Sequence, residues 1–260
     1  IDRSLVGSEM CIRDRISDDQ THMKMACGDS KALPCLTILD PTLTLSQPRR
    51  VTACTGIDAL SHALESAVTL KRNKDSFRHS RIALKLIEKN LPIVFTDPDN
   101  VDARGEVLLG ASHAGAAIER SMLGAAHSMA NPLTAHKGIV HGIAVGLSLP
   151  VVMAYNAEHP EVCSVYAELS RAIQLASKEV TDSEAAQLLI QRVQELLKLA
   201  EFPKSLSDLG FSTSDLSILS IDASKQWTAT FNPRPMDASI FQNLYAQLLS
   251  TSTCDLGSIE

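Results

Sequence analysis

The chain has 260 residues, of which 45% are hydrophobic and 21% are charged, so it can bury a sizeable core and disorder is not expected. Its net charge of −6, together with a sequence that has no long basic run, argues against nucleic acid as a partner. The most apolar stretch, Gly138 to Val152, is too short for a membrane span and is interrupted by His141 and Ser148, so no membrane association is expected.

The beginning of the chain is predicted to be foreign to the native protein. Residues 5–14, Leu-Val-Gly-Ser-Glu-Met-Cys-Ile-Arg-Asp, can be back-translated into a sequence that resembles a transposase-type sequencing adapter. A targeting signal would need a continuous apolar segment, whereas this stretch contains Glu9, Arg13 and Asp14. We therefore interpret residues 1–15 as an assembly artefact and expect the native sequence to enter at Ile16, inside a domain.

The segment from Thr21 to Asp40 is the part of the chain with strand character. The segments Met23–Cys27 and Cys35–Leu39 are short, apolar or alternating, and they are bounded by glycine, aspartate and proline. This pattern is typical of β-strands. The sequence therefore predicts two strands before the main domain.

Residues 41–260 are predicted to form an all-helical domain, so the fold class is mainly α. Apolar residues recur every three or four positions from about Thr52 onward, as helix faces require. Thr181 and Ser212 begin polar segments that are typical of helix N-termini, and Pro132 is expected to end or kink its helix. Beyond a first helix near residues 57–68 and a second near 82–87, the expected helices span residues 101–120, 121–135, 139–154, 161–177, 182–199, 213–221 and 237–248.

Four residues of this helical part suit a single divalent metal ion: Asp58, His62, His127 and His141. Asp58 and His62 are four positions apart, so on a helix they share one face. Three imidazoles and one carboxylate suit Fe²⁺ or Zn²⁺ better than Mg²⁺ or Ca²⁺, which prefer oxygen ligands. The Asp-x3-His pair alone is common by chance, so the surrounding sequence decides how much weight it carries.

That surrounding sequence closely resembles the iron-containing alcohol dehydrogenase family. The resemblance rests on two blocks in order, Ala53–Glu65 and then Gly124–Leu133 with Gly138–Gly142, and it extends from about residue 16 to Asn-Pro-Arg-Pro at 232–235. It implies that the metal ligands are Asp58, His62, His127 and His141. It further implies that residues 16–40 are a remnant of an N-terminal α/β dinucleotide-binding domain, with residues 41–260 as the catalytic metal-binding domain.

One position departs from the family pattern. Four residues after His127, many members carry a further histidine close to the nicotinamide and the substrate, whereas this chain has Asn131. An amide can hydrogen-bond a substrate oxygen, but it cannot carry a proton near neutral pH as imidazole does. Asn131 is therefore the expected contact to the substrate, without a role in proton transfer.

The activity implied by the resemblance is reversible hydride transfer between an alcohol and NAD or NADP, with Fe²⁺ or Zn²⁺ holding the alcohol oxygen. The sequence contains no Gly-x-Gly-x-x-Gly or other glycine-rich phosphate-binding turn, so the chain alone is expected to bind the nucleotide poorly and to be inactive. Glu65 could orient a metal-binding imidazole, although a surface or capping role is equally compatible with its position.

Three other functions remain open at this point. A helical His-Asp phosphohydrolase would display adjacent His-Asp residues, which the sequence lacks. A dehydroquinate-synthase-like enzyme, which binds a metal and NAD, would be favoured by extra Lys and Arg residues around the cleft, and the second block is poor in them. A non-catalytic helical metal-binding domain is the third alternative.

The partner expected is a small alcohol or aldehyde. Scattered cysteines without a Cys-x-x-Cys pair favour a reduced, cytoplasmic protein, and a homodimer is compatible with the sequence.

Overall fold

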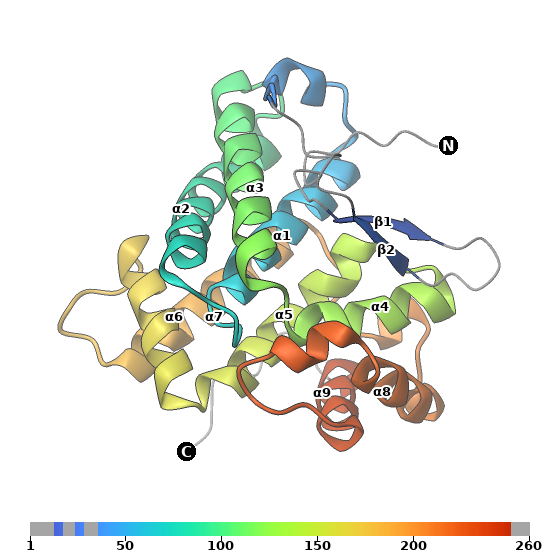
Figure 1. Cartoon of the computed structure of the whole chain (residues 1–260). Coiled ribbons are helices and arrows are strands. Elements are labelled where there is room, and N and C mark those ends of the chain that lie inside the picture. Colours follow the sequence, from blue (N-terminus) through green and yellow to red (C-terminus); the bar gives the residue numbers. More distant parts are fainter. Residues whose placement is uncertain (1–12, 18–23, 29–35, 251–260) are drawn as a thin grey trace.

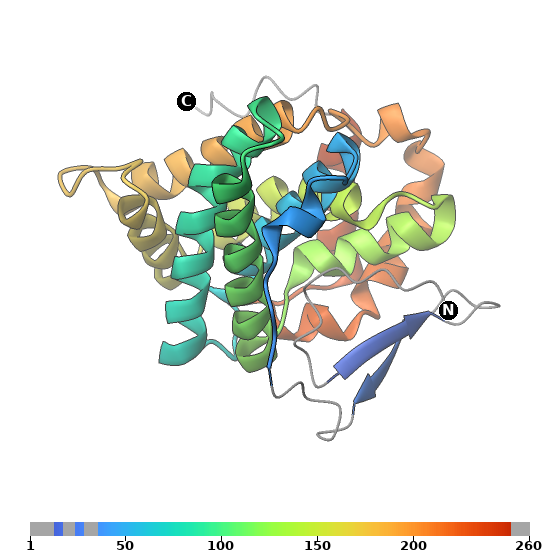
Figure 2. The same cartoon turned by 90° about the horizontal axis from the view of Figure 1, so that it is seen from above.

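The computed structural model describes residues 13–17, 24–28 and 36–250. The described part is mainly helical, and Figures 1 and 2 show its helices packed around one another from two directions. The α-helices are α1 (Arg49–Ser66), α2 (Lys74–Thr96), α3 (Val101–Ser121), α4 (Ala125–Lys137), α5 (His141–Ala157), α6 (Pro160–Ala172), α7 (Asp182–Leu199), α8 (Leu216–Ser224) and α9 (Ala238–Ser250).

Helix α1 lies at the centre of the fold. It packs against α2 and α3 and also against α5, while α4 packs between α5 and α8 (Figure 1). Ile57, Leu60 and Leu64 of α1 are fully buried in the main core. Because α1 is covered on several sides, the polar residues on its buried part must find partners inside the protein.

Two glycines allow α5 to approach α1 closely. A Cβ atom at Gly142 would lie 2.2 Å from the backbone oxygen of Cys54, and one at Gly146 would lie 2.9 Å from Ile57. No side chain fits at the first position without moving one of the two backbones. The close approach places His141, the first residue of α5, beside the helix that carries Asp58 and His62.

Several of the helix predictions are confirmed, and one of the two outcomes expected at Pro132, the end of its helix, is wrong. Helix α7 covers the predicted residues 182–199, and Thr181 with Glu184 forms a capping box at its N-terminus. Helix α4, however, does not end near Pro132 but continues to Lys137. Met129 and Leu133 on either side of the proline are fully buried, and this burial outweighs the single backbone hydrogen bond that a proline removes.

The strand predictions are confirmed only in part. The structure has an antiparallel pair, β1 (Arg13–Ser17) with β2 (Lys24–Gly28), so the strand predicted at 23–27 is present with shifted ends. The strand predicted at 35–39 is wrong, because residues 36–40 form no strand and Leu36 and Ile38 are 75% and 80% exposed. A strand needs a paired neighbour, and within the described residues this segment has none. The expected remnant of an α/β layer is therefore not seen in this part of the chain.

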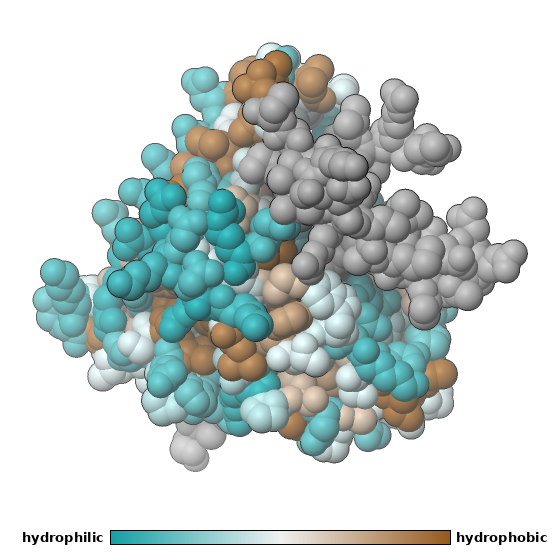
Figure 3. All heavy atoms as spheres, viewed as in Figure 1, coloured by the Kyte–Doolittle hydropathy of each residue, from teal (hydrophilic) through white to brown (hydrophobic). Residues whose placement is uncertain are grey.

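The surface carries a small group of exposed apolar side chains before α1. Leu36, Ile38 and Leu43 are each at least 75% exposed, and Figure 3 shows brown atoms at the top of the view, where this blue segment of Figure 1 lies.

Cys54 and Cys163 are free thiols. None of the helices between residues 36 and 250 has both the length and the apolar character that crossing a bilayer requires.

Candidate metal centre

Three helices bring the four predicted ligand residues together. Asp58 and His62 lie on α1, His127 lies in the first turn of α4, and His141 begins α5. The Asp58 Oδ1 atom is 3.4 Å from Nε2 of His62, 3.4 Å from Nε2 of His127 and 3.9 Å from Nε2 of His141. The imidazole of His127 stacks on that of His62 and is tilted against that of His141, with centroid distances of 4.9 and 5.3 Å.

This arrangement fits a divalent metal ion. Ligand atoms of Asp58, His62 and His127 all lie within 4.8 Å of one another. The 3.4 Å from Asp58 Oδ1 to each of the His62 and His127 Nε2 atoms is about the separation of two tetrahedral ligands that are each ~2.1 Å from one ion. Asp58 Oδ1 and His127 Nε2 are buried and form no hydrogen bond. Buried polar atoms are normally satisfied, so a cation between these two atoms would complete their coordination.

The electrostatics of the centre favour a carboxylate beside imidazoles. Burial alone would raise the pKa of Asp58, but the charges of the neighbouring His62, His141 and His127 outweigh it and hold the pKa well below its ordinary value. Burial likewise opposes protonation of His127, but Glu65 and Asp58 outweigh it and raise the pKa of His127 to about 9. In the metal-free protein Asp58 therefore carries a negative charge beside the imidazoles of the centre.

A buried glutamate supports His127 from behind. Glu65 is 4% exposed, and its Oε2 atom accepts a short hydrogen bond from Nδ1 of His127. Its other oxygen, Oε1, accepts from the backbone N–H of Ala126 at 2.7 Å. Glu65 is thus not a surface residue, and its two oxygens contact both the imidazole and the start of α4.

The start of α4 is also held by Asn232, a residue for which the sequence predicted no role. The Asn232 Oδ1 atom accepts hydrogen bonds from the backbone N–H of Ala125 at 3.3 Å and from Nδ2 of Asn156 at 3.0 Å. The N-cap residue, Gly124, offers no side-chain acceptor, so Glu65 and Asn232 satisfy the first N–H groups of this helix in its place. The only sequence signal for Asn232 was the Asn-Pro-Arg-Pro segment that it begins.

Asn131 follows His127 by four positions on α4 and is held by one contact. Its Nδ2 group donates to Oε1 of Gln226 at 2.9 Å, while Nε2 of Gln226 donates to the backbone oxygen of Asp222 at 3.3 Å. Because the backbone carbonyl of Asp222 can only accept, it fixes Gln226 with its NH₂ group toward Asp222 and its amide oxygen toward Asn131. The Oδ1 atom of Asn131 is then left as an acceptor, buried and without a hydrogen bond.

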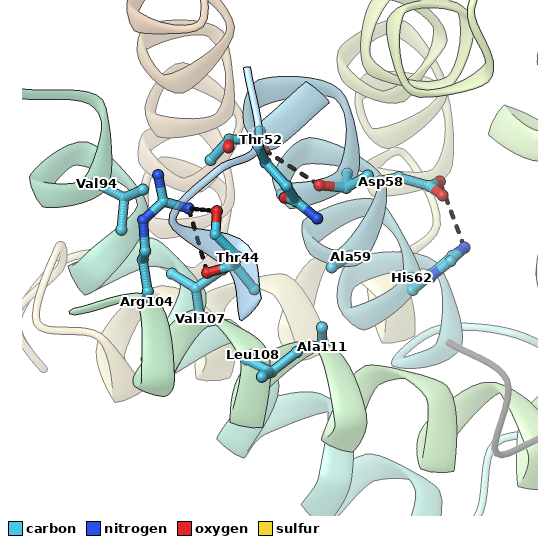
Figure 4. Close-up of a pocket in the computed structure, with 13 residues that line it drawn as sticks. Thr44, Thr52, Asp58, Ala59, His62, Val94, Arg104, Val107, Leu108 and Ala111 are labelled. Carbon is cyan, nitrogen blue, oxygen red and sulfur yellow. Dashed lines mark hydrogen bonds and ion pairs between the residues drawn. The ribbon is translucent and has the colours of Figure 1, made fainter. Parts of the chain in front are cut away.

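A pocket of about 150 Å³ borders the cluster. Figure 4 shows Asp58 and His62 at one end of it and Arg104 at the other, with Val107, Leu108 and Ala111 of α3 along one wall. Arg104 is occupied by the backbone oxygens of Pro98 and Thr44, so it does not offer a free charge to a ligand. The charged end of the pocket is therefore the one formed by Asp58 and His62.

The structure places two other histidines outside this centre. His79 on α2 and His113 on α3 face each other, with their Nδ1 atoms 2.8 Å apart. Burial lowers the pKa of both, and the charges of His113 and Arg120 lower that of His79 further, while Arg78 lowers that of His113. This pair forms a separate feature of the α2–α3 contact.

Comparison with known proteins finds one family model. Residues 52–249 match the C-terminal part of the Fe-containing alcohol dehydrogenase family. Among curated proteins, 1-propanol dehydrogenase PduQ of Citrobacter freundii is 32% identical over 247 residues, which cover 94% of this chain and 67% of that protein.

Solved structures agree with this match. An alcohol dehydrogenase from Oenococcus oeni superposes with a TM-score of 0.86 at 28% identity and covers 92% of this chain and 62% of its own. A sulfoacetaldehyde reductase from Bifidobacterium kashiwanohense, solved with NAD⁺, gives a TM-score of 0.85 at 25% identity and covers 95% and 62%. The chain thus spans about two thirds of the length of the proteins it resembles.

Proposed function

Because the chain belongs to the iron-containing alcohol dehydrogenase family, we propose that it forms the metal-binding part of an enzyme that interconverts an alcohol and an aldehyde or ketone, with NAD or NADP as the hydride carrier. The observation that carries this proposal is the convergence of Asp58, His62, His127 and His141 around two buried atoms that lack hydrogen bonds. The family uses Fe²⁺, and the same ligand set also suits Zn²⁺.

In this proposal Asp58, His62, His127 and His141 hold the metal. When bound, the metal would act as a Lewis acid that favours the ionised form of the alcohol and polarises the carbonyl in the reverse direction. Asp58 contributes a negative charge that attracts the cation, since its pKa is held well below the ordinary value. The three imidazoles come from three different helices, so their positions depend on packing rather than on a flexible loop.

We further propose that Asn131 contacts the substrate or the nicotinamide. It lies one helical turn after His127, on the same face of α4. Its Oδ1 atom needs a donor, and both an alcohol hydroxyl and the carboxamide N–H of nicotinamide can donate. Since an amide does not titrate, the proton released on alcohol oxidation must leave by another route, such as water.

The nucleotide is proposed to be bound mainly by residues outside the helical domain of residues 41–260. This chain carries no glycine-rich phosphate-binding turn, and the relatives are about half as long again as the part that it covers. The sulfoacetaldehyde reductase was solved with NAD⁺, which supports a nicotinamide dinucleotide as the carrier. A small alcohol or aldehyde is the proposed substrate class, in a cytoplasmic protein that has no nucleic-acid or membrane partner.

The test has two steps. The metal-free chain is titrated with Zn²⁺ or, without oxygen, with Fe²⁺; one equivalent should bind, and His62→Ala should weaken binding at least tenfold. The full-length protein that contains this chain is then assayed for NAD(P)H formation with short primary alcohols, with and without a chelator. A chain that binds no divalent metal, or an activity that a chelator leaves intact, contradicts the proposal.

A further inference from the structure

Glu65 divides its two carboxylate oxygens between two donors. One oxygen accepts from the backbone N–H of Ala126 in the first turn of α4, and the other accepts from Nδ1 of His127, the next residue along that helix. Glu65 is almost completely buried and lies on α1, which also carries Asp58 and His62. A single side chain thus joins the helix with two proposed ligands to the helix with the third.

The hydrogen bond to Nδ1 decides which nitrogen of His127 can bind a metal. A neutral imidazole has one N–H and one lone pair, and the nitrogen that donates to a carboxylate keeps the proton. With the proton on Nδ1, the lone pair lies on Nε2. This is the buried atom that forms no hydrogen bond and lies 3.4 Å from Oδ1 of Asp58.

We propose that Glu65 is a positioning residue of the metal centre, which holds His127 with Nδ1 protonated and Nε2 facing Asp58, and which caps α4 with its second oxygen. This inference rests on the proposed function, because it assumes that the centre binds a divalent metal. It assigns to one residue two of the roles that its sequence position left open, the orientation of an imidazole and the capping of a helix. Carboxylates that hold a ligating histidine in this way typically contribute 10- to 100-fold to metal affinity.

The two partners of Glu65 differ in what they can do if the carboxylate becomes an amide. Glu65→Gln has nearly the same shape but offers one oxygen and one NH₂ group. The backbone N–H of Ala126 can only donate, so the amide oxygen of the glutamine must face it and accept this hydrogen bond. The NH₂ group then faces Nδ1 of His127, which must become an acceptor, and the proton moves to Nε2. That tautomer has no lone pair for the metal, although α4 keeps its cap.

The experiment compares wild type, Glu65→Gln and Ser128→Ala. Ser128 is the residue after His127 and is fully buried, and its hydroxyl forms hydrogen bonds with the Gly124 oxygen and the Thr228 hydroxyl. The Zn²⁺ dissociation constant is measured by competition with a chelating dye. We expect about a 10- to 100-fold loss of affinity in Glu65→Gln and less than about a twofold change in Ser128→Ala.

A second measurement keeps the inference separate from a general loss of structure. Imidazole ¹⁵N chemical shifts report directly which ring nitrogen is protonated. They should show Nδ1 protonated in the Zn²⁺-loaded wild type and Nε2 protonated in metal-free Glu65→Gln, with unchanged far-UV circular dichroism. Wild-type affinity in Glu65→Gln, or an Nδ1 proton in that variant, overturns the inference. If the wild type itself binds no Zn²⁺, the proposed function fails instead.

Discussion

Asn131 is a residue whose orientation is decided by its neighbours. Gln226 donates to a backbone carbonyl and so must present its oxygen to Asn131, which leaves Oδ1 of Asn131 as a buried acceptor. The sequence showed that an amide replaces the imidazole that many family members carry, but it did not show which end of the amide is available. That information depends on Gln226, which is remote in the sequence.

Replacing Asn131 tests whether this acceptor meets the substrate. In the full-length protein, Asn131→Leu should lower kcat/KM for alcohol oxidation about tenfold, which corresponds to the loss of one hydrogen bond of ~1.4 kcal/mol. Metal content should not change, because Asn131 is not a proposed ligand. Equal kcat/KM values in the variant and the wild type would contradict a contact to substrate or nicotinamide.

The pair of His79 and His113 predicts how stability depends on pH. Their Nδ1 atoms face each other at 2.8 Å, so one ring must accept and cannot be protonated there. Burial lowers both pKa values in the folded state, so the unfolded chain binds more protons below the ordinary histidine pKa of ~6.5. The contribution of this pair is therefore fully present above that pH and is lost as the pH falls below it.

The measurement is the free energy of unfolding in urea at about pH 5 and about pH 7, in the presence of a chelator. His113→Asn keeps a hydrogen-bonding group near His79 but cannot titrate, so its stability should fall less on acidification than that of the wild type. His159→Asn removes an exposed histidine outside the pair and should retain the wild-type difference. A His113→Asn variant with the wild-type pH dependence would contradict this role of the pair.

At the scale of helices and strands, the spacing of apolar residues predicted an element correctly where that element buries one face. It was misleading where tertiary contacts determine whether the element forms. Helix α7 has its predicted bounds because the capping residues and the apolar stripe are local signals. The segment at 35–39 looked like a strand because its residues alternate, but pairing depends on distant residues that no local pattern reveals. Tertiary contacts also explain why α4 continues past Pro132, because Met129 and Leu133 on either side of it are fully buried.

The close contact of α1 and α5 depends on Gly142. Since a Cβ atom there would lie 2.2 Å from the Cys54 oxygen, Gly142→Ala should destabilise the fold by about 3 kcal/mol or more and displace the adjacent His141. Gly105 in α3 is the matched control, because its added Cβ would meet only Pro41 at 3.5 Å. Gly105→Ala should be stabilising by ~0.5–1 kcal/mol.

Urea unfolding of both variants, followed by Zn²⁺ titration, checks this prediction. Gly142→Ala should lose metal affinity together with stability, whereas Gly105→Ala should bind as the wild type does. If the free energy of unfolding of Gly142→Ala lies within about 1 kcal/mol of the wild-type value, the contact of α1 and α5 accommodates a Cβ atom, and the prediction is contradicted.

At the scale of the whole molecule, the sequence predicted the helical domain but only part of its centre. Helical spacing pairs Asp58 with His62, and Glu65 lies three positions further on the same face, so its role had a local signal. Which of the other seven histidines would join them could not follow from spacing, because His127 and His141 lie on other helices. The family resemblance identified those two residues, and the packing of α4 and α5 explains why they lie beside Asp58 and His62.

A metal held by residues of α1, α4 and α5 would link parts of the chain that are far apart in sequence, so metal binding should stabilise the entire fold. At a free Zn²⁺ concentration about 100 times the dissociation constant, the free energy of unfolding should rise by ~2.7 kcal/mol. Asp58→Asn keeps the size of the side chain but removes the charge, so its stability should barely respond to Zn²⁺. Urea unfolding with and without Zn²⁺ measures both, and an equal gain in wild type and Asp58→Asn would mean that the ion binds elsewhere.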